Sequence, residues 1–326
     1  MQPSFKEIII AAVIAMLAGF GIWYLKNSSA TNFVSGVVAN PADVLKNDNG
    51  RTNVLLLGMG GEGHSGGDLT DSILLASFNL SEGTVKLTSV PRDIWVADEQ
   101  AKINSLYHYG NEAEEGTGLA KAKHAIGTFF GIPIHYALAL DFQGFVKAID
   151  AIGGIDVEVS RTFDDYKYPI PGKETVEPES DRYEHVHFEQ GTQHMDGTTA
   201  LKFARSRHAL GEEGTDFARG LRQEKIILAF RNKLFSAGTI FDADKLGNLK
   251  NSISTSINTD ITSTEQGGFT KLFLSVGSKD NISSFSLIEQ FKNPPISKNY
   301  GGQWVLVPKN TIEELHQYVA KTLQTH

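Results

Sequence analysis

The hydrophobic pattern of the chain predicts a series of short strands. Brief apolar or alternating segments, each followed by glycine or polar turn residues, are typical of strands in a packed sheet. The predicted strands are Asn53–Leu57, Ser72–Phe78, Val85–Val90, Tyr136–Leu140 and Ile155–Val159. Between the second and the third of them, the polar residues Asn79–Thr84 predict a turn.

Apolar residues at helical spacing predict three helices between and after these strands. They cover Leu119–Phe130, Phe142–Ile152 and Ala218–Phe235, and glycines follow the first two. Thr198–Phe203 is consistent with a short helix or with the beginning of a strand. Because strands and helices alternate, we expect an α/β fold with a central mixed β-sheet flanked by helices.

Two regions have a weaker pattern. Arg161–Glu189 contains three prolines and many charges, and is predicted to be rich in loops. After Phe241, serine and asparagine become frequent and no new charged motif occurs. We expect residues 242–326 to complete the same domain.

The N-terminus carries an apolar segment that is long enough to cross a membrane. Ile8–Leu25 contains no charged residue and is flanked by Lys6 and Lys26. As a helix it would be ~27 Å long, close to the hydrocarbon thickness of a bilayer. Trp23 and Tyr24 suit a membrane interface. We predict a transmembrane anchor, with a cleaved signal peptide as the alternative because Asn27–Thr31 could be a cleavage region.

These patterns divide the 326-residue chain into consecutive segments. The predicted order is a cytoplasmic tail (1–7), a transmembrane anchor (8–25), a linker (26–50), an α/β domain (51–241) and its C-terminal completion (242–326). We therefore expect a single-pass protein of the cell membrane, with its large domain outside the cytoplasm.

Composition excludes several classes of function. The formal net charge of -8 argues against a general nucleic-acid-binding protein. The chain contains no cysteine, so it has no disulfide, no thiolate metal site and no cysteine nucleophile. No Gly-x-Ser-x-Gly elbow occurs either.

A glycine-rich stretch, LLLGMGGEGHSGGDLTDSILLASF, raises the question of a nucleotide site. Gly58, Gly60 and Gly63 match the spacing of a dinucleotide-binding turn. Such a turn opens a helix, whereas here a predicted strand follows. No Gly-Lys-Ser/Thr occurs. We therefore interpret the glycines as a turn between two strands, which delivers Asp71 to its position.

Arginines in paired arrangements predict a site for a polyanionic group. Arg205 and Arg207 would point to one face if this segment is extended. Arg219, Arg222 and Gln223 would share one face of the last predicted helix, and Arg92 follows a strand. The guanidinium fork suits phosphate oxygens. For each arginine alone, a surface salt bridge is the alternative.

Two aspartates near these motifs are candidates for chemistry. Asp71 would be a natural Mg²⁺ ligand beside a phosphate, or else a turn residue. Asp93 could be a ligand, a hydrogen-bond acceptor or a partner that orients its neighbour Arg92. The spacing of His64, His185 and His187 does not define a zinc site.

Taken together, the motifs resemble the LytR–CpsA–Psr family of cell-wall glycopolymer transferases. The matching motifs fall in order between about Asn53 and Phe230. They are NVLLLG, TDSILLASF, TSVPRD, KINSLYHYG, DFQGFVKAIDAIGGIDVEV, GTQHMDGTTALKFARSRH and DFARGLRQEKI.

The resemblance implies an extracytoplasmic α/β phosphotransferase anchored in the membrane. Such an enzyme moves a glycopolymer phosphate from an undecaprenyl-pyrophosphate lipid to peptidoglycan, with Mg²⁺ as cofactor. It implies that Asp71 is associated with the metal, that Asp71, Arg92 and Asp93 are catalytic, and that no nucleic acid is bound. The implied pyrophosphate ligands are Arg92, Arg205, Arg207, Arg219, Arg222 and Gln223.

The sequence departs from the family pattern at two positions. Leu69 stands where the family commonly has an arginine, in Leu69-Thr70-Asp71-Ser72, and Met59–Glu62 replaces a stretch that tends to contain an aspartate. Asp68 or Glu62 could substitute as a metal partner. Two alternatives therefore stay open: a polyprenyl-pyrophosphate hydrolase, and a non-catalytic protein that binds lipid-linked glycans.

Overall fold

The chain forms two compact units in this computed structural model. The sheet unit comprises residues 32–60, 68–140 and 257–326, and the arginine unit comprises residues 1–31, 61–67 and 141–256. The structure describes residues 30–61, 66–173, 175–234, 236–240, 242, 244–245, 248–249, 257–275 and 282–324. The predicted anchor at 8–25 and the proposed metal partner Glu62 lie outside these ranges, as do Gly63 and His64.

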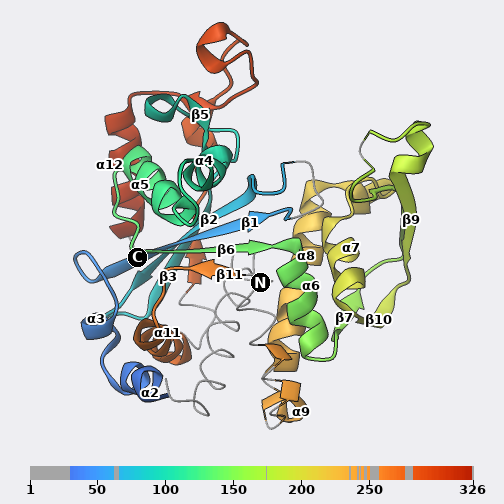
Figure 1. Ribbon diagram of the computed structural model, residues 1–326, viewed down its shortest axis with the longest axis horizontal. Coiled ribbons are helices and arrows are strands. Elements are labelled where there is room, and N and C mark those ends of the chain that lie inside the picture. Colours follow the sequence, from blue (N-terminus) through green and yellow to red (C-terminus); the bar gives the residue numbers. More distant parts are fainter. Residues whose placement is uncertain are drawn as a thin grey trace. The chain divides into compact units, whose positions relative to one another are not determined.

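A six-stranded mixed sheet is the framework of the sheet unit (Figure 1). Its order is β11 (Ile257–Thr259), β6 (Tyr136–Asp141), β1 (Arg51–Met59), β2 (Thr70–Asn79), β3 (Thr84–Ser89) and β12 (Ile282–Ser284). The pairs β1–β2, β2–β3 and β11–β6 are antiparallel, and β12 runs parallel to β3. The predicted central mixed sheet and its first three strands are thereby confirmed.

Both faces of this sheet are covered by helices. Alternate residues of each central strand point to opposite faces, so each strand contributes side chains to both packed layers. Leu55, Leu57, Ile73 and Leu75 belong to one core cluster with residues of three helices. These helices are α4 (Leu106–Ala113), α5 (Gly118–Phe130) and α12 (Ile312–Gln324). On the other side, the ring of Phe269 on α11 (Ser263–Ser275) packs edge-on against Phe78 and Tyr136. Helices therefore flank a sheet in three layers (Figure 1).

The segment that was predicted to be a linker differs from that prediction. Within 26–50, the chain forms α2 (Ala30–Val38) and α3 (Pro41–Val44), and both Phe33 and Leu45 are buried. A side chain at Gly36 would collide with the backbone of Thr264 on α11, so the two helices approach closely. Phe33 and Leu45 of this stretch therefore belong to the core of the sheet unit, whereas Val34 and Val38 are exposed.

Helix α5 ends as the sequence predicts. Gly131 has φ +67° and its N–H binds the carbonyl groups of Gly127 and Thr128. A Cβ at Gly131 would also lie within 3 Å of the His316 ring on α12. Glycine is therefore required both by the left-handed conformation and by the contact with α12.

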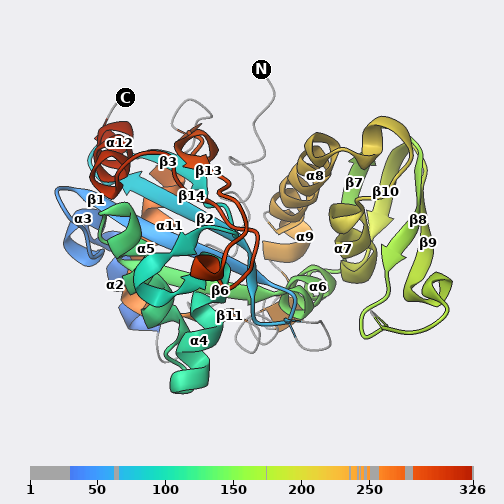
Figure 2. The same cartoon turned by 90° about the horizontal axis from the view of Figure 1, so that it is seen from above.

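The arginine unit contains two small antiparallel sheets and a group of helices (Figure 2). One sheet pairs β7 (Ile155–Val159) with β10 (Gly191–Met195), and the other pairs β8 (Phe163–Pro169) with β9 (Tyr183–Phe188). The helices are α6 (Phe142–Ala151), α7 (Gly197–Arg205), α8 (Asp216–Leu234) and α9 (Ala237–Ile240). Strand β7 and the helices α6 and α8 match the prediction, and α7 decides the open choice at 198–203 in favour of a helix.

The prediction that Arg161–Glu189 is rich in loops was wrong, because β8 and β9 form an antiparallel pair there. Phe163, Asp165 and Tyr168 are buried in β8. The register shifts between Asp165 and Tyr168. This irregularity and the buried acidic residue break the apolar alternation by which a strand is recognised in a sequence.

Short strands and the C-terminal segment complete the sheet unit. The β4–β5 pair joins Trp95–Val96 to Ala101–Lys102, and β13 (Phe291–Lys292) pairs with β14 (Val307–Pro308).

Within the ranges given above, the structure contains no helix with the length and apolar character needed to span a bilayer.

Candidate active site

The exposed pair of Asp71 and Arg92 lies at one end of the central sheet. Asp71 is near the start of β2, and Arg92 follows the end of β3. Because β2 and β3 are antiparallel neighbours, these two ends meet. Arg92 Nη1 donates to Asp71 Oδ1 over 2.5 Å. The side chains are 48% and 52% exposed, so this charged pair is open to an approaching ligand.

Backbone contacts of Asn104 fix the two residues in place. The Asn104 carbonyl accepts a hydrogen bond from the hydroxyl of Thr70, which immediately precedes Asp71. The Asn104 N–H donates to the carbonyl of Arg92. The backbone of one buried residue therefore ties the start of β2 to the turn after β3, and so holds the segments that carry Asp71 and Arg92.

Asp93 lies next to this pair and is held by two cations. Lys102 Nζ donates to Asp93 Oδ1 over 2.6 Å, and Arg92 Nε is 3.6 Å from Asp93 Oδ2. Lys102, which the sequence analysis did not select, thus belongs to the cluster. Its position within the KINSLYHYG motif was the available signal, but a lone lysine gave no reason to choose it.

The structure describes only one of the two alternative metal partners, Asp68. Glu62 lies outside the described residues, and Asp68 Oδ2 is 2.5 Å from His108 Nδ1. In the described part of the chain, no three histidine, aspartate or glutamate side chains form a group that could hold a metal ion. Mg²⁺ often uses one or two protein carboxylates together with substrate phosphates. The exposed carboxylate of Asp71 fits that manner of binding, whereas a preformed cage is absent from these residues.

In the arginine unit, Arg222 is buried and its guanidinium is occupied by protein groups. Its side chain is 3% exposed. Nε donates to the carbonyl of Phe203, Nη2 to the carbonyl of Ser206, and Nη1 to the carbonyl and the carboxylate of Glu213. The ring of Phe163 lies 4.8 Å from the guanidinium carbon. Arg222 therefore closes the C-terminal end of α7 and joins it to α8.

Asp165 holds the same segment from the other side. Its Oδ2 accepts hydrogen bonds from the Ser206 hydroxyl at 2.6 Å and from the N–H groups of Arg207 and His208 at 3.1 Å. Burial raises the pKa of this carboxyl, but these hydrogen bonds and one from Lys167 outweigh burial and the pKa is lowered. We call Asp165 and Arg222, which together hold residues 203–208, the loop clamp.

The loop clamp presents Arg205 and Arg207 in a way that differs from the predicted extended pair. Arg205 is the last residue of α7, and Arg207 follows in irregular backbone. The Arg205 guanidinium lies 4.2 Å from the Phe142 ring centre and 5.8 Å from that of Tyr168. Arg207 is exposed. The extended geometry was wrong because the helix runs through Arg205.

The other candidate residues of this unit are less informative. Arg219 and Gln223 lie on α8, and the structure does not describe their side chains. His185 and His187 both contact Asp164 Oδ1, at 2.7 and 2.8 Å. These three side chains form a hydrogen-bonded cluster on the β8–β9 pair.

The structure thus brings together two sets of predicted residues, one in each unit. Asp71, Arg92 and Asp93 meet in the sheet unit. In the arginine unit, Arg205 and Arg207 lie on one segment, and Arg222 of α8 binds the backbone of that segment. Lys102, Asp165 and Glu213 were not predicted. Asp165 could have been noticed as an acidic residue at an inward position of β8, had the strand been recognised.

The glycine stretch is the connection between β1 and β2. Gly58 is still within β1, opposite Ser72, and the described residues 66–69 form no helix before β2 begins. The N–H of Gly61 binds the carbonyl of Gly67 over 2.7 Å, which closes the base of the loop. The rejection of a dinucleotide-binding turn is therefore confirmed.

Comparisons with known proteins all match this chain to one family. The model of the LytR_cpsA_psr family matches residues 24–321. A polyisoprenyl-teichoic acid–peptidoglycan teichoic acid transferase, TagV of Bacillus subtilis, is 28% identical over 268 residues, covering 79% of this chain and 59% of TagV. The TagU transferase of Bacillus cereus is 27% identical over 214 residues, covering 64% of this chain and 60% of TagU. The chain thus spans about 60% of the length of these two curated relatives.

Solved structures share the fold. The crystal structure of Bacillus subtilis TagV superimposes with a TM-score of 0.54 at 24% identity, covering 86% of this chain and all of TagV. The Lin1025 protein of Listeria innocua gives a TM-score of 0.55 at 25% identity, with 86% and 100% coverage. A structure of TagT bound to LIIa-WTA gives 0.53 at 21% identity, with 86% and 93% coverage.

Proposed function

Since this chain belongs to the LytR_cpsA_psr family, we propose that it is a membrane-anchored extracytoplasmic phosphotransferase. It moves a glycopolymer phosphate from a polyprenyl-pyrophosphate carrier to a hydroxyl of peptidoglycan. The names of its relatives TagV and TagU, which are polyisoprenyl-teichoic acid–peptidoglycan teichoic acid transferases, support this choice of donor and acceptor. The family match begins at residue 24, within the last two residues of the apolar segment Ile8–Leu25 that we propose as the anchor.

The observation that carries the proposal is the exposed charged cluster at the end of the central sheet. Arg92 offers a permanent cation to an anionic phosphate oxygen. Asp71 and Asp93 lie on either side of it, the first at 2.5 Å and the second at 3.6 Å from Arg92 nitrogens. A cation flanked by two carboxylates combines charge stabilisation with a proton acceptor, which is what phosphoryl transfer to a hydroxyl requires.

The transfer is an in-line displacement at the phosphorus next to the glycopolymer. The acceptor oxygen forms the new P–O bond, and the bridging oxygen of the pyrophosphate leaves on the polyprenyl phosphate. Asp71 or Asp93 takes the proton of the acceptor hydroxyl. Arg92 neutralises charge on the phosphoryl oxygens as the bond to the leaving group breaks. Lys102 keeps the carboxylate of Asp93 in position.

We propose that Mg²⁺ is bound by Asp71 together with the donor phosphates. When bound, it supplies further neutralisation of the pyrophosphate charge. We further propose that Arg205, Arg207, Arg219 and Gln223, which all belong to the arginine unit, bind the donor head group. The contacts of Arg222 favour a different role for this residue, because its donors already bind carbonyl groups and Glu213. We assign Arg222 to holding the segment that carries Arg205 and Arg207.

A transfer assay with three variants of the full chain tests the proposal. The protein, in detergent, receives a polyprenyl-pyrophosphate glycan, Mg²⁺ and peptidoglycan oligomers. Arg92→Ala and Asp71→Asn should each lower kcat/KM by about 10²–10³-fold, as the loss of a group that stabilises transition-state charge does. The matched control is Arg161→Ala, because Arg161 and Glu212 also form an exposed ion pair, with side chains 59% and 80% exposed, outside the proposed site.

The outcomes separate the three candidate functions. Transfer to peptidoglycan that depends on Arg92 supports the phosphotransferase. Phosphate release without acceptor would instead identify a hydrolase. Binding of the donor with no turnover would leave only a glycan-binding protein, and equal losses in Arg161→Ala would remove the assignment of the site.

A further inference from the structure

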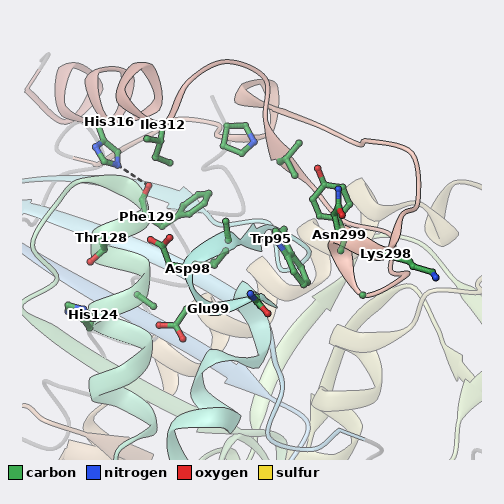
Figure 3. A pocket seen from close by; sticks show the side chains of 18 residues that line it. Trp95, Asp98, Glu99, His124, Thr128, Phe129, Lys298, Asn299, Ile312 and His316 are labelled. Atoms are coloured by element: carbon green, nitrogen blue, oxygen red, sulfur yellow. Dashed lines mark hydrogen bonds between the residues drawn. The ribbon is translucent and has the colours of Figure 1, made fainter.

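A cavity on the sheet unit lies beside the proposed active site and has no role in the mechanism above. Its volume is about 1070 Å³. One wall comprises β4 and the turn that follows it, a second comprises α5, and a third comprises the 298–301 turn and the start of α12 (Figure 3). Sites for single small molecules usually measure ~300–1,000 Å³, so this cavity suits a ligand of several linked rings.

The lining combines aromatic rings with groups that form hydrogen bonds. Trp95 and Tyr300 meet edge to face, with ring centres 5.8 Å apart and planes at 82°. Asp98, Asn299 and His124 are among the polar groups of the same lining (Figure 3). Flat apolar faces beside hydrogen-bonding groups match the two surfaces of a pyranose ring, namely its C–H face and its hydroxyl rim.

The charges of the cavity argue against the other ligands of the proposed reaction. Among the described residues, its lining contains no arginine. Glu99 is already paired with Lys121 at 2.5 Å, which leaves Asp98 and Lys298 as opposite charges. A phosphate polymer would require a cluster of cations. A polyprenyl chain would bury the carboxylate, amide and imidazole groups without partners. An uncharged saccharide meets neither difficulty.

The position of Trp95 connects the cavity to the proposed active site. Trp95 pairs across the β4–β5 ribbon with Lys102, so their side chains lie on the same face. On that face Lys102 reaches the carboxylate of Asp93. The Cα atoms of Asp93 and Trp95 are no more than about 7.6 Å apart, because two peptide units separate them. A saccharide that contacts Trp95 therefore extends toward Asp93.

From this arrangement we propose that the cavity is a saccharide-binding subsite for the glycan backbone of the acceptor. This identification of the ligand as the acceptor rests on the proposed transferase function. The C-terminal segment, through Tyr300 and Asn299, supplies the outer wall of the subsite, and Trp95 supplies the surface nearest to the active site. The subsite positions the acceptor hydroxyl beside Asp93 and Arg92.

Binding of chitotetraose, an uncharged tetrasaccharide of N-acetylglucosamine, to the full chain in detergent tests the subsite without any donor. Titration calorimetry should give saturable binding, and Trp95→Ala and Tyr300→Ala should each weaken it at least about ten-fold, as loss of an aromatic anchor does. Trp95→Phe should retain most of the affinity. Trp304→Ala is the matched control, because Trp304 is 48% exposed on the same C-terminal segment but does not line the cavity.

Several results would overturn the subsite. These are wild-type affinity in both Trp95→Ala and Tyr300→Ala, absence of saturable binding in the wild type, or binding only of a cationic stem peptide. Tyr300 lies in a turn outside the sheet, so its variant decides the matter if Trp95→Ala does not fold. In the transfer assay, Trp95→Ala should raise the KM for the acceptor and leave the KM for the donor unchanged. If Trp95→Ala catalyses transfer with an unchanged acceptor KM, the subsite is refuted but the transferase function is not. If the wild type binds the saccharide but catalyses no transfer, the transferase function is refuted but saccharide binding is not.

Discussion

Two arginines that the sequence places in one functional group, Arg92 and Arg222, have opposite surroundings. Arg92 is 48% exposed, and its partners are the side chains of Asp71 and Asp93. Arg222 is 3% exposed and binds two carbonyl groups of the 203–206 segment as well as Glu213. An arginine with exposed carboxylate partners can exchange them for a phosphate, whereas one that satisfies buried carbonyl groups cannot leave them without cost.

The difference indicates how each unit is built for its task. The sheet unit displays charges on a hydrogen-bonded backbone, in which the N–H and the carbonyl of Asn104 join Arg92 to Thr70. The arginine unit also uses charges internally, through the loop clamp of Asp165 and Arg222. In the function that we propose, Arg92 contacts the ligand and Arg222 supports the structure, although their side chains are chemically identical.

The largest effect is expected from removing the buried arginine. Arg222→Ala leaves Glu213 and two carbonyl groups without their partner, and should destabilise the arginine unit by about 3–5 kcal/mol. Arg222→Lys should rescue only part of this loss, because an ammonium cannot reproduce the fork geometry. Hydrogen exchange of the backbone amides of α7 and α8 measures this destabilisation locally. The described tryptophans, Trp95 and Trp304, belong to the sheet unit, so their fluorescence serves as an internal control. Exchange of α8 at the wild-type rate would contradict the structural role of Arg222.

A smaller effect is expected at the other half of the loop clamp. Asp165→Asn should cost about 1–3 kcal/mol, because a buried carboxylate that accepts four hydrogen bonds is replaced by an amide that accepts fewer. The folded state lowers the pKa of Asp165. The contribution of Asp165 to the free energy of unfolding is therefore fully present above the pKa of this carboxyl in the unfolded chain, about 4. It is lost as the pH falls through the lower pKa that Asp165 has in the folded state.

Stability measured between about pH 7 and pH 2 separates this effect from general damage. The wild type should lose the Asp165 contribution at acidic pH, and Asp165→Asn should lack that part of the decline. Glu158→Gln on the adjacent strand β7, where Glu158 is exposed, serves as the control for removing one carboxylate. Parallel pH curves for the wild type and Asp165→Asn would show that the charge of Asp165 does not matter.

The smallest effect on stability is expected at the exposed pair. Asp71→Ala, Arg92→Ala and the double variant should show a coupling energy below about 1 kcal/mol, because exposed ion pairs are solvated in both states. At about 1 M salt, where charges are screened beyond ~3 Å, this coupling should fall further. A coupling as large as that of the Arg222 contacts would remove the distinction between the two arginines.

Much of the fold was predictable, because it depends on local pattern. Strands β1, β2 and β3 are continuous apolar or alternating runs, and Gly131 marks the end of α5 by its conformation. The β8–β9 pair was missed because a buried aspartate and an irregular register interrupt the alternation. Helices α2 and α3 were missed because they are short, with nine and four residues, and only the packing against α11 shows that Phe33 and Leu45 belong to a core.

The candidate site was predictable as a set of residues but not as an arrangement. Spacing on a helix can assign Arg222 to a face, yet only the tertiary structure shows that this face meets the end of α7 and Glu213. The same holds for Lys102, whose relation to Asp93 depends on the β4–β5 turn. The aromatic cavity was not predicted at all, since Trp95 and Tyr300 are far apart in the sequence and meet through the C-terminal segment.

The strand order of the sheet unit also has a consequence for how the protein is made. Both outer strands, β11 and β12, come from the part of the chain beyond residue 256, whereas β6 and β3 beside them are synthesised much earlier. Until the last segment emerges, a nascent chain has two unpaired sheet edges, which are templates for aggregation. The C-terminal segment thus covers both edges of the sheet once it has been synthesised. A truncated chain that ends near residue 241 should therefore need a chaperone to stay in solution.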